Sequence, residues 1–143
     1  MDRSTVKAED EKKSAKKYHA WHGLVAGLIV EVYLCLFSAS WCPPCRAEMP
    51  RIAKTYAETL KDDPDIELIH FSRDQNDEKA LAWAKEHDVK FPVVKPNGGN
   101  PLDLHSRGIP HLFIVKTDGT LVEEGHPMKL FSEEKLRVLT SGK

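Results

Sequence analysis

Residues 37–46 of this 143-residue chain read FSASWCPPCR. The run before the first cysteine, from Val30 to Phe37, is dense in β-branched, aromatic and aliphatic residues, which predicts a strand buried on both faces of a parallel or mixed sheet. After the two prolines, apolar residues recur at helical spacing from Met49 to Leu60, and Pro50 among them predicts a kink. The two cysteines therefore lie where a central strand gives way to a helix.

Cys42 and Cys45 have the spacing and position that thiol chemistry needs. A thiol at the N-terminus of a helix meets unpaired N–H groups and the positive end of the helix dipole, which stabilise a thiolate. Cys42 is therefore the predicted nucleophile, and Cys45, one turn further on, can attack a mixed disulfide on Cys42 and release the bound thiol. Because Pro43 and Pro44 carry no N–H, only the amide of Cys45 is expected to donate to the Cys42 sulfur among the nearest amides.

Composition narrows the possible functions. With 143 residues, 41% of them apolar, the chain suits one compact domain, and a net charge of -1 disfavours nucleic acid as a partner. Three cysteines are too few for a disulfide scaffold, and Cys35, in the predicted central strand, is interpreted as a small buried hydrophobe. No glycine pattern for a nucleotide is present, so no organic cofactor is expected beyond a redox-active disulfide of Cys42 and Cys45.

The rest of the chain predicts an α/β domain. Further strands are expected at Ile66–Ser72 and in a hairpin formed by Leu112–Lys116 and Thr120–Glu124, with a short extended piece at Val93–Val94. Helices are expected at Asn76–Asp88, capped by Asn76, and at Ser132–Ser141, capped by Ser132. This order predicts a mixed sheet with helices on both faces, in a domain over residues 21–143 that follows a charged tail or lead-in helix over residues 1–20.

The apolar stretch from Leu24 to Phe37 could be a membrane-spanning helix or an export signal. It holds 14 residues and includes Glu31, whereas a spanning helix needs about 20 apolar residues. Lysines precede it and Ser38-Ala39-Ser40 follow it, as in an export signal, but cleavage there would leave Trp41-Cys42 at the new N-terminus. We therefore expect no membrane span and a cytoplasmic protein, with a periplasmic location as the alternative if a signal or anchor has been removed.

The chain resembles the thioredoxin superfamily over roughly residues 30–127. The features that carry this resemblance are FSASWCPPCR, Pro50, and Gly108-Ile109-Pro110 before the hairpin. FSASWCPPCR is similar to tryparedoxins and nucleoredoxins, and the run from Cys45 to Pro50 also resembles TlpA-like thiol-disulfide oxidoreductases. The resemblance implies a thioredoxin-like three-layer sandwich. It also implies a monomeric protein-disulfide oxidoreductase, favoured as a reductase, that acts on protein substrates and exchanges electrons with an upstream donor or acceptor.

The resemblance further implies roles for single residues. Cys42 matches the attacking thiol and Cys45 the resolving thiol. Trp41 matches the aromatic neighbour of the site, and Pro110 matches the cis-proline that lies against the active-site disulfide. The backbone before that proline, at Ile109, is where an extended substrate segment is expected to pair.

The group that accepts a proton from the resolving thiol is left open. Glu48 matches a glutamate implicated in proton handling in TlpA-like proteins, although a solvated helix glutamate explains it equally well. Leu36 stands where thioredoxins carry a buried aspartate. His70 and His111 could act as bases near neutral pH, but a hydrogen-bonded strand histidine and a surface histidine are the favoured interpretations.

Two other functions fit the same residues. A metal-binding module could hold Cu(I) or Zn with Cys42, Cys45 and a histidine such as His111, although no histidine lies near the motif in the sequence. A redox-inactive interaction domain is the other alternative, and the intact cysteine pair argues against it. The direction of electron flow depends on the redox potential more than on the motif.

Overall fold

The computed structural model describes residues 31–96, 98 and 103–141. The predicted tail or lead-in helix over residues 1–20, and the apolar residues before Glu31, lie outside the described residues. Within these ranges no helix combines the length and the apolar character that crossing a membrane requires.

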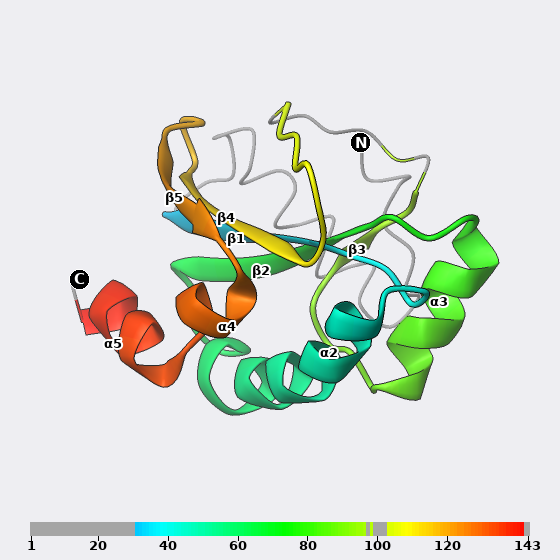
Figure 1. Ribbon diagram of the computed structural model, residues 1–143. Coiled ribbons are helices and arrows are strands. Elements are labelled where there is room, and N and C mark those ends of the chain that lie inside the picture. Colours follow the sequence, from blue (N-terminus) through cyan, green and yellow to red (C-terminus); the bar gives the residue numbers. More distant parts are fainter. Residues whose placement is uncertain (1–30, 97, 99–102, 142–143) are drawn as a thin grey trace.

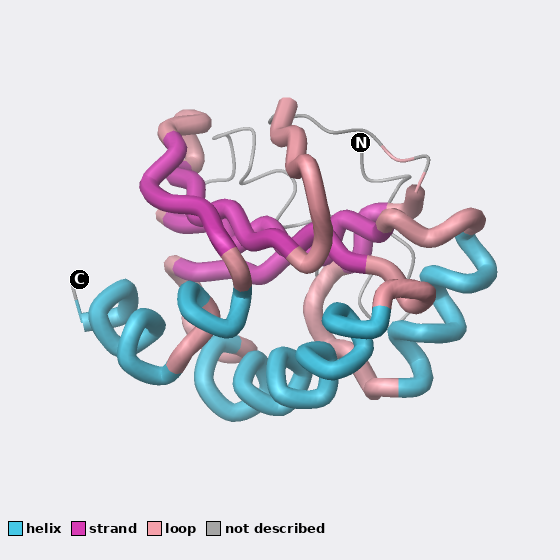
Figure 2. Tube along the Cα trace, viewed as in Figure 1, coloured by secondary structure: helices cyan, strands magenta, loops and turns pink. Residues whose placement is uncertain are grey.

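Among the described residues, a five-stranded mixed sheet forms the centre of the fold (Figures 1 and 2). Its order is β3-β2-β1-β4-β5, with β1 at Val32–Ser38, β2 at Ile66–Ser72, β3 at Val93–Val94, β4 at His111–Lys116 and β5 at Leu121–Gly125. Strand β1 pairs with β2 in parallel and with β4 antiparallel, so it is the middle strand, as its run of apolar residues predicted. The predicted hairpin is β4 and β5, and in its turn Gly119 has a φ of 93°, a conformation open to glycine at little steric cost.

The described residues form four α-helices, which are α2 Pro43–Thr55, α3 Asp77–Glu86, α4 Pro127–Leu130 and α5 Glu133–Ser141. Both predicted caps are confirmed. The side chain of Asn76 accepts from the N–H of Lys79 at 2.9 Å at the start of α3, and the Ser132 hydroxyl accepts from the N–H of Lys135 at 3.2 Å at the start of α5.

Two helical segments differ from the prediction. The helix after the cysteines continues as a π-helix over Tyr56–Leu60, in which the N–H of Lys61 donates to the carbonyl of Tyr56 at 2.8 Å. Apolar spacing predicted one continuous α-helix there, because Tyr56 and Leu60 are buried in either form. The short helix α4 was not predicted at all, since four residues that begin with Pro127 are too few to show a helical period.

Alternate side chains of β1 enter two core clusters, one on each face of the sheet. Leu34 and Leu36 pack with Met49 of α2 and Trp83 of α3, whereas Cys35 lies fully buried in the second cluster, which confirms it as a small buried hydrophobe. Connections β1-α2-β2 and β2-α3-β3 step the same way along the sheet, and right-handed crossovers then place both helices over one face. The predicted mixed sheet with helices is therefore present. The described helices lie over this one face, and no helix among the described residues covers the other face, where helices were also expected (Figure 1).

Candidate active site

Cys42 is the N-cap residue of α2. Its backbone is extended, with φ -98° and ψ 113°, and the helix begins at Pro43 immediately after it. Its sulfur accepts a hydrogen bond from the N–H of Cys45 at 3.3 Å, which is the one nearby amide that the two prolines leave as a donor. The sequence therefore places Cys42 at the positive end of the helix, where a thiolate is stabilised.

Cys45 lies deeper than Cys42. Its side chain is 1% exposed, against 5% for Cys42, and both thiols are free. Burial raises the pKa of Cys45 well above its ordinary value, and the hydrogen bond with Cys42 raises it further. The two cysteines are thus unequal, because the surroundings of Cys45 favour its protonated thiol.

The substrate-binding residues implied by the resemblance lie beside Cys42. The Ile109-Pro110 peptide bond is cis, and the Cys42 thiol donates to the carbonyl of Ile109 at 3.7 Å across 67 residues of sequence. Trp41 is 56% exposed, and its indole N–H donates to the carbonyl of Arg73 at 3.0 Å. An exposed indole and the backbone before Pro110 therefore border the sulfur of Cys42.

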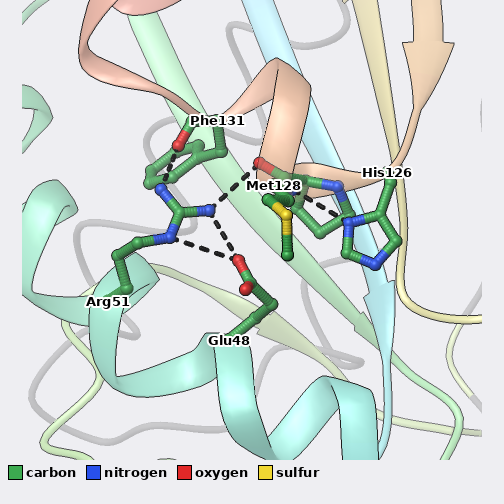
Figure 3. A network of polar contacts seen from close by, with 6 residues as sticks. Glu48, Arg51, His126, Met128 and Phe131 are labelled. Atoms are coloured by element: carbon green, nitrogen blue, oxygen red, sulfur yellow. Dashed lines mark hydrogen bonds and ion pairs between the residues drawn. The ribbon is translucent and has the colours of Figure 1, made fainter.

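Glu48 makes its polar contacts with Arg51, among the residues that the structure describes (Figure 3). Its carboxylate is 13% exposed and accepts from Nε of Arg51 at 3.2 Å and from Nη2 at 2.6 Å. Arg51 also donates to the carbonyl of Pro127 at 3.1 Å and to the carbonyl of Phe131. Through Arg51, this ion pair connects helix α2 to both ends of α4. The same contacts restrain the Glu48 carboxylate from turning toward the thiols.

The two histidines occupy different environments. Nε2 of His70 lies 2.7 Å from the hydroxyl of Ser38, and burial lowers the pKa of His70 to about 4. His111 pairs with Glu124 at 2.9 Å across the hairpin. Both therefore match the favoured interpretation of a satisfied strand or surface histidine. Over the described ranges of the chain, no three His, Cys, Asp or Glu side chains gather as metal ligands.

Acid is expected to destabilise the protein through His70. The folded pKa is about 4, against about 6.5 for an unfolded chain, so the unfolded state binds the proton first. Stability due to neutral His70 is complete above about pH 6.5 and is lost as the pH falls through about 4, by at most about 3 kcal/mol. Urea unfolding at a series of pH values should therefore show a shallower acid loss for His70→Gln than for the unmodified protein; equal slopes would contradict the assignment.

Asp74 was not singled out by the sequence analysis, yet it lies against the turn that carries Cys42. It is 5% exposed, and its Oδ1 accepts from the backbone N–H of Ser40 at 3.1 Å and from the Ser40 hydroxyl at 2.5 Å. Oδ2 accepts from the Ser72 hydroxyl at 3.2 Å. The available signal was its place just after a buried parallel strand, since side chains there meet at the carboxyl edge of the sheet.

Proteins similar to this chain include ones named as thiol-disulfide oxidoreductases. The chain is 30% identical over 107 residues to the thiol-disulfide oxidoreductase ResA of Bacillus thuringiensis, with 73% of this chain and 61% of ResA covered. It is 40% identical over 126 residues to the "Probable nucleoredoxin 1" of Arabidopsis thaliana, with 80% of this chain and 22% of that protein covered. The chain therefore spans about three fifths of the first relative and about a fifth of the second.

Structural similarity points the same way. The crystal structure of thioredoxin from Wuchereria bancrofti matches with a TM-score of 0.58 and 27% identity, covering 80% of this chain and 83% of that one. The predicted thioredoxin-like fold and the predicted resemblance to the thioredoxin superfamily are thus confirmed. Residues 27–124, more than half of the chain, match the AhpC/TSA family. The chain belongs to the AhpC/TSA family.

Proposed function

We propose that the chain is a protein-disulfide oxidoreductase that reduces disulfides in protein substrates. The observation that carries the proposal is the arrangement of its two thiols, with Cys42 at the N-cap and the amide of Cys45 donating to its sulfur at 3.3 Å. This arrangement gives a nucleophile that a helix N-terminus stabilises and a second thiol within one turn. The relatives named as thiol-disulfide oxidoreductases support the same reaction class.

The reaction takes two exchange steps. The Cys42 thiolate attacks one sulfur of the substrate disulfide, forms a mixed disulfide and releases the other sulfur as a thiolate, which takes up a proton from solvent. Cys45 then loses its proton and attacks the sulfur of Cys42, so that the Cys42–Cys45 disulfide forms and the second substrate thiol leaves. Two electrons pass to the substrate, and an external dithiol has to reduce the pair before the next cycle.

The surface beside Cys42 is proposed to bind an extended substrate segment. The Cys42 thiol donates to the carbonyl of Ile109 at 3.7 Å. A substrate backbone paired with Ile109 would therefore lie beside the reacting sulfur. Trp41 would cover the substrate side chain next to the disulfide, because its ring is exposed while its N–H is held by the Arg73 carbonyl. Pro110 would border the opposite side, as the resemblance implies.

Glu48 remains a proposed proton acceptor for Cys45. To act in this way, its carboxylate would have to leave the pair with Arg51, which donates to it through two nitrogen atoms. The cytoplasmic location that the sequence favoured also remains a prediction.

The midpoint potential of the Cys42–Cys45 couple tests the proposed direction of electron flow. The protein is equilibrated against graded glutathione and dithiothreitol buffers, and trapped thiols are counted by mass spectrometry. A value near about -270 mV is expected for a reductant, whereas a value of about -180 to -120 mV would instead indicate a disulfide donor or an isomerase. If no two-electron couple titrates, the oxidoreductase proposal fails.

A further inference from the structure

A cleft opens at the carboxyl edge of the parallel strands β1, β2 and β3, the edge at which open α/β sheets bind ligands. Phe37, Phe71 and Val94 are register partners in one row across these strands. The rings of Phe37 and Phe71 stack with 4.8 Å between their centroids, and with Val94 they form an apolar floor. The cleft encloses about 270 Å³, slightly less than the pockets of about 300 Å³ and more that take drug-sized ligands, so it suits a single side chain.

The walls of the cleft carry cationic side chains. Arg73 follows β2, Lys95 follows β3, and both line the cleft. Nζ of Lys95 lies 4.0 Å from Oδ2 of Asp77, a long ion pair. The Arg73 guanidinium donates to the hydroxyl of Ser106 at 3.5 Å, and among the residues that the structure describes it has no carboxylate partner. A carboxylate that enters the cleft would therefore meet a guanidinium whose charge is not already paired.

Two acidic side chains near the cleft have partners of their own. Oδ1 of Asp103 lies 2.8 Å from Nε2 of His105. Asp74, which follows Arg73 in the sequence, accepts from the N–H of Ser40 at 3.1 Å and from the hydroxyl of Ser72 at 3.2 Å. The described residues that line the cleft include two basic side chains and a histidine, and no carboxylate is among them. The charge of the cleft therefore favours an anionic occupant.

Two segments connect the cleft to Cys42. The first is Arg73, whose backbone carbonyl accepts from the indole N–H of Trp41 at 3.0 Å while its side chain lines the cleft. The second is the loop that runs from Ser106, in the cleft, to Ile109, whose carbonyl accepts from the Cys42 thiol at 3.7 Å. Ile109 comes three residues after Ser106, a span of at most about 11 Å. A substrate that extends from Cys42 along this loop therefore reaches the cleft within about three residues.

We propose that this cleft binds an acidic side chain of the protein substrate, about three residues from the substrate cysteine. The carboxylate accepts from the guanidinium of Arg73, and the methylene groups of a glutamate lie over the rings of Phe37 and Phe71. The inference rests on the proposed thiol-disulfide exchange. It adds a selection among substrates by the charge that accompanies the reacting cysteine.

Arg73→Gln tests the inference, because it removes the guanidinium and keeps the backbone carbonyl that holds Trp41. The substrates are short peptides with one cysteine activated as a 4-pyridyl disulfide, and with either glutamate or glutamine three positions before or after that cysteine. The Cys42 thiolate attacks the peptide sulfur, the bond to the pyridyl sulfur breaks, and the leaving group takes up a proton as 4-thiopyridone. The absorbance of 4-thiopyridone then reports the rate of this first exchange step.

For the unmodified protein we expect a glutamate peptide to react roughly threefold faster than its glutamine counterpart at low peptide concentration. In Arg73→Gln the ratio of the two rates should fall to about one, and in Arg73→Glu a peptide with lysine at the same position should have the advantage. Lys116→Gln is the matched control. It removes an exposed cation whose strand partner is Val32, at the opposite end of β1 from Phe37, and it should leave the ratio in place.

The outcomes separate the two proposals. If the unmodified protein releases 4-thiopyridone no faster than Cys42→Ser, the proposed function fails. If it reacts but shows no preference for glutamate, or if Arg73→Gln retains that preference, only the inference on the cleft is overturned. Equal inhibition of all peptides by free glutarate, without a preference among them, would assign the cleft to a free carboxylate and also overturn it. Should circular dichroism show that Arg73→Gln does not fold, the unmodified protein has to lose the preference in about 1 M sodium chloride, where the screening length is about 3 Å.

Discussion

Cys42→Ser is expected to lower the rate of disulfide reduction by at least about 1000-fold. A serine hydroxyl at the N-cap keeps an acceptor for the N–H of Cys45, so helix α2 should form unchanged. Oxygen cannot form the disulfide with a substrate sulfur, however, and both exchange steps are lost. The measurement is reduction of a protein disulfide such as that of insulin, with dithiothreitol as the electron source and the uncatalysed rate subtracted.

Cys35→Ala is the matched control for this variant. It also removes one thiol, but that thiol is fully buried in the core cluster on the other face of the sheet. Its expected effect is a modest loss of stability with turnover retained. Ordinary turnover by Cys42→Ser, with a normal circular dichroism spectrum, would exclude Cys42 as the nucleophile.

Cys45→Ser is expected to trap the protein as a mixed disulfide with its substrate and to lengthen the lifetime of that species at least about 100-fold. The first step still proceeds, because Cys42 retains its place at the helix N-terminus. The second step has no internal thiol within reach. Alkylation followed by non-reducing electrophoresis and mass spectrometry should show one substrate joined to Cys42.

A trapped complex also identifies the physiological substrates, since it can be recovered from an extract and released by a reductant. The reference is the unmodified protein, in which Cys45 clears the intermediate. If Cys45→Ser turns over without accumulating a covalent species, an external thiol performs the resolving step and the two-cysteine mechanism is wrong.

Local sequence patterns predicted the frame of the fold closely. The strand at Ile66–Ser72 has the bounds that its apolar run indicated, and the side chain of Asn76 caps α3 as expected. These features depend on neighbouring residues only. The π-helix at Tyr56–Leu60 was not predicted because one extra residue in a turn leaves both buried positions buried.

The sequence predicted those features of the site that depend on residues close together in the chain. The N-cap position of Cys42 and the single amide donor follow from four consecutive residues. The contact of Cys42 with Ile109 spans 67 residues, and that of Asp74 with Ser40 spans 34, so neither has a local signature. A family resemblance supplied the first contact, whereas the second could be found only once β1 and β2 were paired.

The middle position of β1 has a consequence for how the site responds to fluctuations. Edge strands fray first, and in the part of the sheet that the structure describes the edges are β3, two residues long, and β5, whose side chains are mostly exposed. Opening of either edge leaves β1 bonded on both sides, to β2 and β4. The backbone that ends at Ser38 and leads into the cysteines therefore belongs to the part of the sheet whose amides exchange last with solvent. Forms of the protein in which β3 or β5 has opened would therefore keep Cys42 and Cys45 in place, and the thiol pair could still react in them.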